Sequence, residues 1–141
     1  MADIVIFEDN MSLSLYWRSI LEENCHQVRC CSTVSKALEL VLEATPELLI
    51  ADMLIKQDGR FIPEGGITLL HKLAARELIT FPVLGVSGYR ASSYKSLSAL
   101  DIAKSMKISL ALYKPITPQK LLQTVSKLLN NQRTSPATLN D

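Results

Sequence analysis

The sequence lacks several features that would assign it to common functional classes. No apolar run approaches the roughly 20 residues of a membrane-spanning helix, so we expect no membrane association. The formal net charge is only +1, without the concentrated basic excess of nucleic-acid-binding domains. The three cysteines, Cys25, Cys30 and Cys31, lack metal-ligand spacing and are expected to be reduced, mostly buried thiols. The segment MADIVIFEDN has acids where a secretory signal would have basic residues, which predicts a cytoplasmic location.

The length and composition indicate one globular domain. The chain has 141 residues, of which 48% are hydrophobic and 21% charged, which is enough to bury a core. We place the domain at residues 1–131. Residues 132–141 are polar and have no apolar face, so they are expected to form a tail or linker.

Short apolar runs alternate with patterns of helical periodicity along the chain. The predicted strands are 3–7, 27–31, 47–52, 81–88 and 108–113. The predicted helices are about 12–24, 33–44, 65–77, one that ends near Met106, and 117–131. Thr33 or Ser35 is expected to cap the second helix, and Thr117 the last one, with Pro118 at its first position.

The helical patterns also predict which residues face the core. They are Leu13, Trp17, Ile20 and Leu21; Val34, Ala37, Leu38, Val41 and Leu42; Ile67, Leu70 and Ala74; and Leu121, Leu122, Val125, Leu128 and Leu129. Strands that alternate with helices in this way predict an α/β fold, with a five-stranded, doubly wound parallel sheet and helices on both faces. Ligands of such sheets bind at the carboxyl ends of the strands.

Polar side chains follow four of the five predicted strands. Glu8 and Asp9 follow the first, Asp52 ends the third, Ser87 lies at the end of the fourth, and Lys114 follows the fifth. In a parallel sheet these positions meet at one edge. Three crowded carboxylates repel one another, and a divalent cation, most suitably Mg²⁺, removes that conflict. The lysine beside them is placed for an incoming anion.

This set of residues, in this order, resembles the receiver domain of two-component response regulators over residues 3 to about 130. The resemblance implies a flavodoxin-like strand order of 2-1-3-4-5. It also implies that Asp52 accepts a phosphoryl group from a histidine kinase or phosphotransfer protein. Ser87 and Lys114 would then contact phosphoryl oxygens. Such a chain is a regulatory phosphoacceptor and not an enzyme acting on a separate substrate.

The resemblance also implies a metal site and a signalling surface. Asp9, Asp52 and the backbone carbonyl of Leu54 would hold Mg²⁺, with help from Glu8. The peptide bond between Lys114 and the following proline would be cis. A downstream protein would bind through the fourth helix, the fifth strand and the fifth helix. The cognate kinase, the output pathway and the choice between monomer and homodimer stay open.

The sequence departs from the family pattern in two places that matter for signalling. The loop after Asp52 is long and delays Gly66, which opens the third helix. In the family, an aromatic residue stands three positions before the lysine and turns inward when the conserved Ser or Thr moves, but here that position is Ala111. Tyr113 lies on the same side of the strand, so we expect the switch to be absent or rerouted through Ser87 and Tyr113.

Two other functions are compatible with parts of this pattern. A degenerate receiver would bind a partner without being phosphorylated. Ala111 and the enlarged loops, one after Asp52 and one between Ser87 and Lys114, favour it. A phosphohydrolase of the haloacid dehalogenase type would use an aspartate at the end of the first strand with a second Asp two residues later. Here the residue two positions after Asp9 is Met11, which argues against that enzyme.

Overall fold

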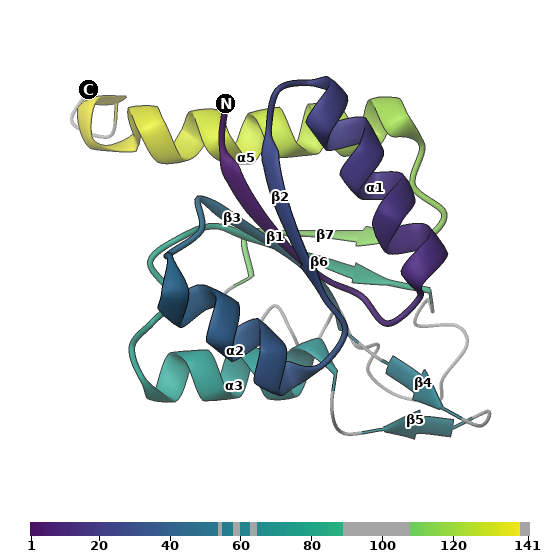
Figure 1. The fold of residues 1–141 in the computed structure, drawn as a ribbon. Coiled ribbons are helices and arrows are strands. Elements are labelled where there is room, and N and C mark those ends of the chain that lie inside the picture. Colours follow the sequence, from purple (N-terminus) through teal and green to yellow (C-terminus); the bar gives the residue numbers. More distant parts are fainter. Residues whose placement is uncertain (54, 58–59, 63–64, 89–107, 139–141) are drawn as a thin grey trace.

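The computed structural model describes residues 1–53, 55–57, 60–62, 65–88 and 108–138 (Figure 1). The strands are β1 (Asp3–Phe7), β2 (Gln27–Cys31), β3 (Leu48–Asp52), β4 (Ile55–Gln57), β5 (Arg60–Ile62), β6 (Val83–Ser87) and β7 (Leu110–Tyr113). The helices are α1 (Met11–Glu23), α2 (Val34–Glu43), α3 (Gly66–Ala75) and α5 (Pro118–Thr138). The predicted helix that ends near Met106 lies outside the described residues.

Five of these strands form one parallel sheet in the order β2-β1-β3-β6-β7. Since β6 and β7 are its fourth and fifth strands along the chain, the predicted order 2-1-3-4-5 is confirmed. The central strand β3 is buried at every position. A strand covered on both faces has no room for polar alternation, which explains the continuous apolar run in its sequence.

Alternate residues of the strands build two separate cores, one on each face of the sheet. In β1, Val5 and Phe7 pack with residues of α2 and α3, whereas Ile4 and Ile6 pack with residues of α1 and α5. Figure 1 shows these two helix layers on opposite faces of the sheet. The period of two along each strand therefore decides which helices cover which face.

Three side chains cap the helices that follow the strands. Asn10 accepts a hydrogen bond from the backbone N–H of Leu13 and begins α1 slightly before the predicted start. Thr33, one of the two predicted candidates, caps α2. Thr117 accepts from the backbone N–H of Lys120, as predicted for the last helix. Each cap satisfies a backbone donor that the first turn leaves unpaired.

The predicted inward faces of α2 and α3 were wrong at one residue each. In α2, Leu42 is 57% exposed and Leu40 is buried instead. In α3, Ala74 is exposed and the buried leucines are Leu69, Leu70 and Leu73. Each residue turns the helix by about 100°, so a face assigned from apolar character alone can include a residue at its edge that the packing leaves exposed. The predicted inward residues of α1 and α5 lie at or beside the core.

The long segment after β3 contains a small antiparallel pair of strands, β4 and β5, which the sequence did not predict. Figure 1 places this pair beside the main sheet, near the start of α3. At the other end of the chain, α5 continues to Thr138, past the predicted domain boundary at residue 131. The division into domain and tail stays a prediction. In the described part of the chain, no helix has the length and apolar character needed to cross a membrane.

Candidate phosphoacceptor and metal site

The carboxyl ends of β1 and β3 bring three acidic side chains together. Phe7 pairs with Ala51 in the parallel register, so the residues that follow them, Glu8 and Asp52, lie at the same edge of the sheet. Glu8 is 1% exposed and Asp52 is 3% exposed, whereas Asp9 is exposed. Two nearly buried carboxylates at the end of an apolar sheet are costly unless they are compensated.

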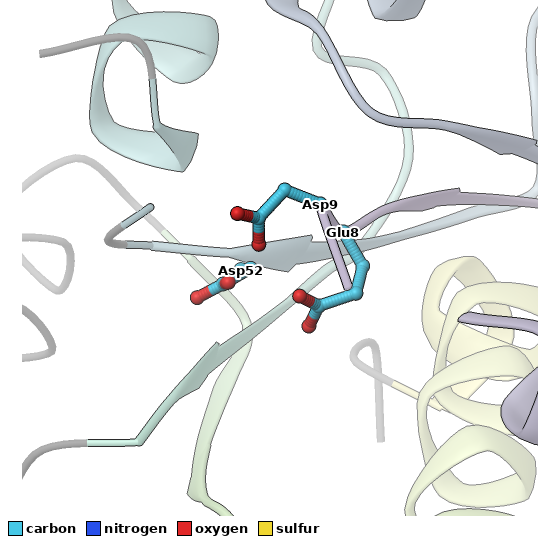
Figure 2. Close-up of side chains that lie close together, drawn as sticks. All are labelled: Glu8, Asp9 and Asp52. Atoms are coloured by element: carbon cyan, nitrogen blue, oxygen red, sulfur yellow. The ribbon is translucent and has the colours of Figure 1, made fainter. Parts of the chain in front are cut away.

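The three acids can serve one cation. Glu8, Asp9 and Asp52 each offer a carboxylate oxygen, and these oxygens lie within 4.8 Å of one another. Figure 2 shows the three carboxylates gathered at the strand ends. An oxygen-only set of this kind is typical of a hard divalent cation. The predicted acidic cluster is therefore present as a geometric unit.

Lys114 completes the cluster from the segment that follows β7. Its Nζ lies 2.8 Å from Glu8 Oε1 and 3.4 Å from Asp52 Oδ2. The Glu8 contact is the closer of the two ion pairs. The backbone N–H of Lys114 donates to Ser87 O at 2.7 Å, which fixes the lysine against the end of β6. The peptide bond between Lys114 and Pro115 is cis.

The crowding shifts the protonation equilibria of the site. Burial, together with the nearby charge of Glu8, raises the pKa of Asp52 to about 7, although Lys114 opposes the shift. Burial and Glu8 also raise the pKa of Asp9. Burial alone would lower the pKa of Lys114, but its contacts with Glu8 and Asp52 outweigh that effect and raise it. The free pocket thus disfavours the ionised form of its central aspartate.

Two features of the pocket favour an added positive charge. With all three carboxylates ionised, the single ammonium of Lys114 would leave a net charge of −2. In addition, Asp52 Oδ1 is buried and accepts no hydrogen bond from the described residues. A buried carboxylate oxygen without a partner is unfavourable. A divalent cation beside Asp52 would compensate both the charge and the unpaired oxygen.

The remaining predicted site residues lie on β6, on β7 and after β3. Ser87 is fully buried at the end of β6, one residue beyond Val86, the partner of Asp52 in the strand register. Ser87 pairs in register with Tyr113 on β7. Ala111 and Tyr113 pack against the same core, so they share one side of the strand as predicted. Leu54, the predicted source of a metal-binding carbonyl, lies outside the described residues.

Gly66 at the start of α3 allows this helix to approach the end of β3 closely. A Cβ atom at Gly66 would lie 2.6 Å from the backbone oxygen of Asp52 and 3.0 Å from Met53 Cα. These backbone atoms at the end of β3 cannot yield as a flexible side chain could. Gly88 differs, because its nearest neighbour for an added Cβ would be Lys114 Cδ at 3.9 Å, an ordinary contact distance.

The sequence did not predict two contributors to the site. The backbone N–H of Asn10 donates to Glu8 Oε2 at 3.1 Å, which orients the buried glutamate. Trp17 was predicted only as a core residue, but its ring lies 6.0 Å from Lys114 Nζ. The Asn10 contact could have been inferred from its position directly after two acids. The Trp17 contact joins residues far apart in the chain, and no local pattern indicates it.

Comparisons with known proteins identify the fold. No protein-family model matches the chain, and no curated protein matches it by sequence. A CheY-like response regulator receiver domain protein from Methanospirillum hungatei has a TM-score of 0.79 at 23% identity, over 96% of this chain and 98% of that one. The receiver domain of NtrX from Brucella abortus has a TM-score of 0.76 at 20% identity, over 91% of this chain and 98% of that one.

A longer NtrX structure from the same organism, in complex with ADP, matches with a TM-score of 0.80 at 19% identity. The match covers 97% of this chain but only 29% of that one, so the chain spans less than a third of the longer NtrX protein. At these sequence identities the structural similarity shows a shared backbone fold. The chain has the flavodoxin-like fold of response-regulator receiver domains.

Proposed function

We propose that this chain is a phosphorylation-dependent signalling receiver whose phosphoacceptor is Asp52. The phosphoryl donor would be a phosphohistidine of a histidine kinase or of a phosphotransfer protein. The observation that carries the proposal is the environment of Asp52. It has a buried carboxylate oxygen without a partner on one side and the Lys114 ammonium 3.4 Å from its other oxygen. The receiver fold supports a regulatory role over that of an enzyme with a separate substrate.

Mg²⁺ is the proposed cofactor. Asp9 and Asp52 would hold it with help from Glu8, because these residues supply the oxygen ligands and the negative charge that suit a divalent cation. The backbone carbonyl of Leu54 is proposed as a further ligand of the ion. When bound, the cation would neutralise charge on the phosphoryl group during transfer.

The proposed phosphoryl transfer to Asp52 is a displacement at phosphorus. An oxygen of Asp52 forms a bond to phosphorus while the bond between phosphorus and the donor histidine nitrogen breaks, and the electron pair stays on the imidazole. Lys114 attracts one phosphoryl oxygen, and the Ser87 hydroxyl donates a hydrogen bond to another. These groups act by position and charge, which is the main contribution of a protein to phosphoryl transfer.

Signalling would follow from the new negative charge on Asp52, which biases the chain between two conformations. The proposed output surface consists of β7, α5 and the fourth helix, of which the last lies outside the described residues. We expect Ser87 and its register partner Tyr113 to couple the site to this surface. We also propose a cytoplasmic location. Signalling through this surface is compatible with a monomer and with a homodimer.

A second candidate is a degenerate receiver that binds a partner without phosphorylation. Two observations favour it. Ala111 replaces the usual aromatic switch residue, and the β4–β5 pair enlarges the segment next to Asp52. The proposed contact surface could then operate constitutively. The clustered acids and Lys114 argue for the phosphorylated form, since a binding module has no need for a costly buried carboxylate at this position.

Intact-mass spectrometry distinguishes these functions. The wild-type chain and Asp52→Ala are incubated with Mg²⁺ and acetyl phosphate, with Glu39→Gln as a control that neutralises an exposed acid. We expect a labile phosphoryl adduct on the wild type and on the control, and none on Asp52→Ala. No adduct on any of the three, with either acetyl phosphate or a phosphorylated kinase as donor, would favour the degenerate receiver. Donor turnover that survives in Asp52→Ala but is lost in a further variant, Asp9→Ala, would indicate a hydrolase.

A further inference from the structure

The Lys114 ammonium has a third neighbour besides the two carboxylates. Its Nζ lies 6.0 Å from the centroid of the Trp17 ring. Trp17 is the only tryptophan of the chain and is 1% exposed. A lysine ammonium within about 6 Å of an indole face is attracted by the negative potential of the ring. This attraction is stronger where water is excluded, as it is around a buried indole.

The fold brings these two residues together from opposite ends of the chain. Trp17 lies on α1, which Asn10 caps immediately after β1. Its ring packs in the core that also contains Ile4 and Leu21. Lys114 reaches this region from the segment after β7, and its side chain is 23% exposed. The indole therefore lies at the point where the core under α1 meets the lysine of the site.

The three neighbours of Lys114 differ in what the proposed reaction does to them. Asp52 receives the phosphoryl group, so its attraction for the ammonium changes during the reaction. Glu8 belongs to the acidic cluster, so a bound cation would weaken its attraction for the Lys114 ammonium. The Trp17 ring neither offers a metal ligand nor contacts the reacting groups directly, so it is the neighbour of Lys114 whose charge state stays constant during the reaction. A flexible four-carbon side chain otherwise loses considerable rotamer entropy when it is held in one place.

We infer that Trp17 is a positioning residue that holds the Lys114 ammonium over the phosphoacceptor pocket by a cation–π contact. The inference rests on the proposed function, since it assigns Trp17 a part in phosphoryl transfer to Asp52. This positioning role differs from a packing role in the core in two ways. It requires an aromatic face at position 17, and it affects the phosphorylation rate only through Lys114.

A double-mutant cycle tests this dependence on Lys114. The rate of phosphorylation by acetyl phosphate is measured for the wild type, Trp17→Leu, Lys114→Ala and the double variant. Trp17→Leu should lower the rate roughly three- to tenfold, the size expected for loss of a desolvated cation–π contact. In the Lys114→Ala background the same change should have less than about a twofold effect. Equal losses with and without Lys114 would overturn the inference.

Two further variants separate positioning from packing. Trp17→Phe keeps an aromatic face and should recover most of the rate lost in Trp17→Leu. Leu21→Val removes one methylene from the same core, on the next turn of α1, and should destabilise the chain without lowering the rate. If Leu21→Val slows phosphorylation as much as Trp17→Leu does, Trp17 is a packing residue and the inference is wrong.

A spectroscopic measurement tests the contact without any phosphoryl donor. In lysine-labelled protein, the indole ring current should move the Hε resonances of Lys114 upfield from those of the other lysines. The shift should persist in Trp17→Phe at reduced size and vanish in Trp17→Leu. Unshifted Lys114 resonances in the wild type would overturn the inference. A wild-type chain that accepts no phosphoryl group would overturn the proposed function instead, and the spectrum would still decide whether the contact exists.

Discussion

Replacing Asp52 by asparagine should stabilise the metal-free protein. The substitution keeps the shape of the side chain and removes a charge that burial and Glu8 disfavour. The direction of the effect on stability follows from the linkage between ionisation and folding. Because the pKa of Asp52 is higher in the folded state than its ordinary value of 3.8, ionisation of this residue favours unfolding. The penalty is absent below pH 3.8, grows as the pH rises, and is complete above the folded-state pKa of about 7.

The size of this penalty can be bounded from the shift. A rise from 3.8 to about 7 is roughly three pKa units, and at about 1.4 kcal/mol per unit this sets an upper bound of about 4 kcal/mol. Relaxation of the pocket and water near its rim reduce the effect, so we expect a gain on the order of 2 kcal/mol at pH 8. In a chain of this size such a gain raises the melting temperature by about 6 °C.

Urea unfolding of the wild type and Asp52→Asn at pH 5, 6, 7 and 8, with a chelator present, measures the difference. Glu39→Gln is the matched control, since it removes the same charge from a residue whose side chain is 61% exposed. The advantage of Asp52→Asn should increase from pH 5 to pH 8, whereas the control should show no such trend. Addition of Mg²⁺ at pH 8 should stabilise the wild type and leave Asp52→Asn nearly unchanged. A constant or negative effect of Asp52→Asn across this pH range would refute the reasoning.

Other features of the structure lead to further predictions. The Arg29 guanidinium donates to both carboxylate oxygens of Asp3 and to the backbone oxygens of Leu40 and Ala44, so Arg29→Met should lower the free energy of unfolding by about 2–3 kcal/mol in urea titrations. Gly66→Ala should cost about 1–3 kcal/mol by overpacking against Asp52 O, whereas Gly88→Ala, measured in the same way, should be nearly neutral. Burial raises the pKa of the Cys31 thiol to about 12, so iodoacetamide should modify exposed Cys25 in the native protein and Cys31 only after unfolding, as peptide mass mapping would show. Rapid native modification of Cys31 would contradict its placement in the core.

The central part of the fold could be predicted because its pattern is strong and its topology is restricted. A run such as Leu48 to Ala51, apolar at every position, leaves few alternatives to a strand covered on both faces. Alternation with helices then requires right-handed crossovers. The same topology allowed Asp9, Asp52 and Lys114 to be placed together although they are far apart in the sequence.

The features that were not predicted depend on weaker or longer-range information. The pair β4–β5 has strands of three residues each, too short for periodicity to distinguish them from a loop. Leu40 and Leu42 are equally apolar, and only the direction of α2 relative to the sheet decides which one is buried. The contact between Trp17 and Lys114 depends on how α1 lies over the sheet, so it follows from packing and from no local pattern.

The most direct test of the central claim is a crystal structure of the chain with Mg²⁺ and beryllofluoride, which mimics an aspartyl phosphate. We predict beryllium bonded to a carboxylate oxygen of Asp52, a magnesium ion on the oxygens of Asp9 and Asp52, and Lys114 Nζ beside a fluorine atom. Comparison with the free chain should also show Tyr113 moving together with Ser87. Beryllofluoride bound elsewhere, or an Asp52 that binds neither group, would contradict the claim that this pocket is built for phosphoryl transfer.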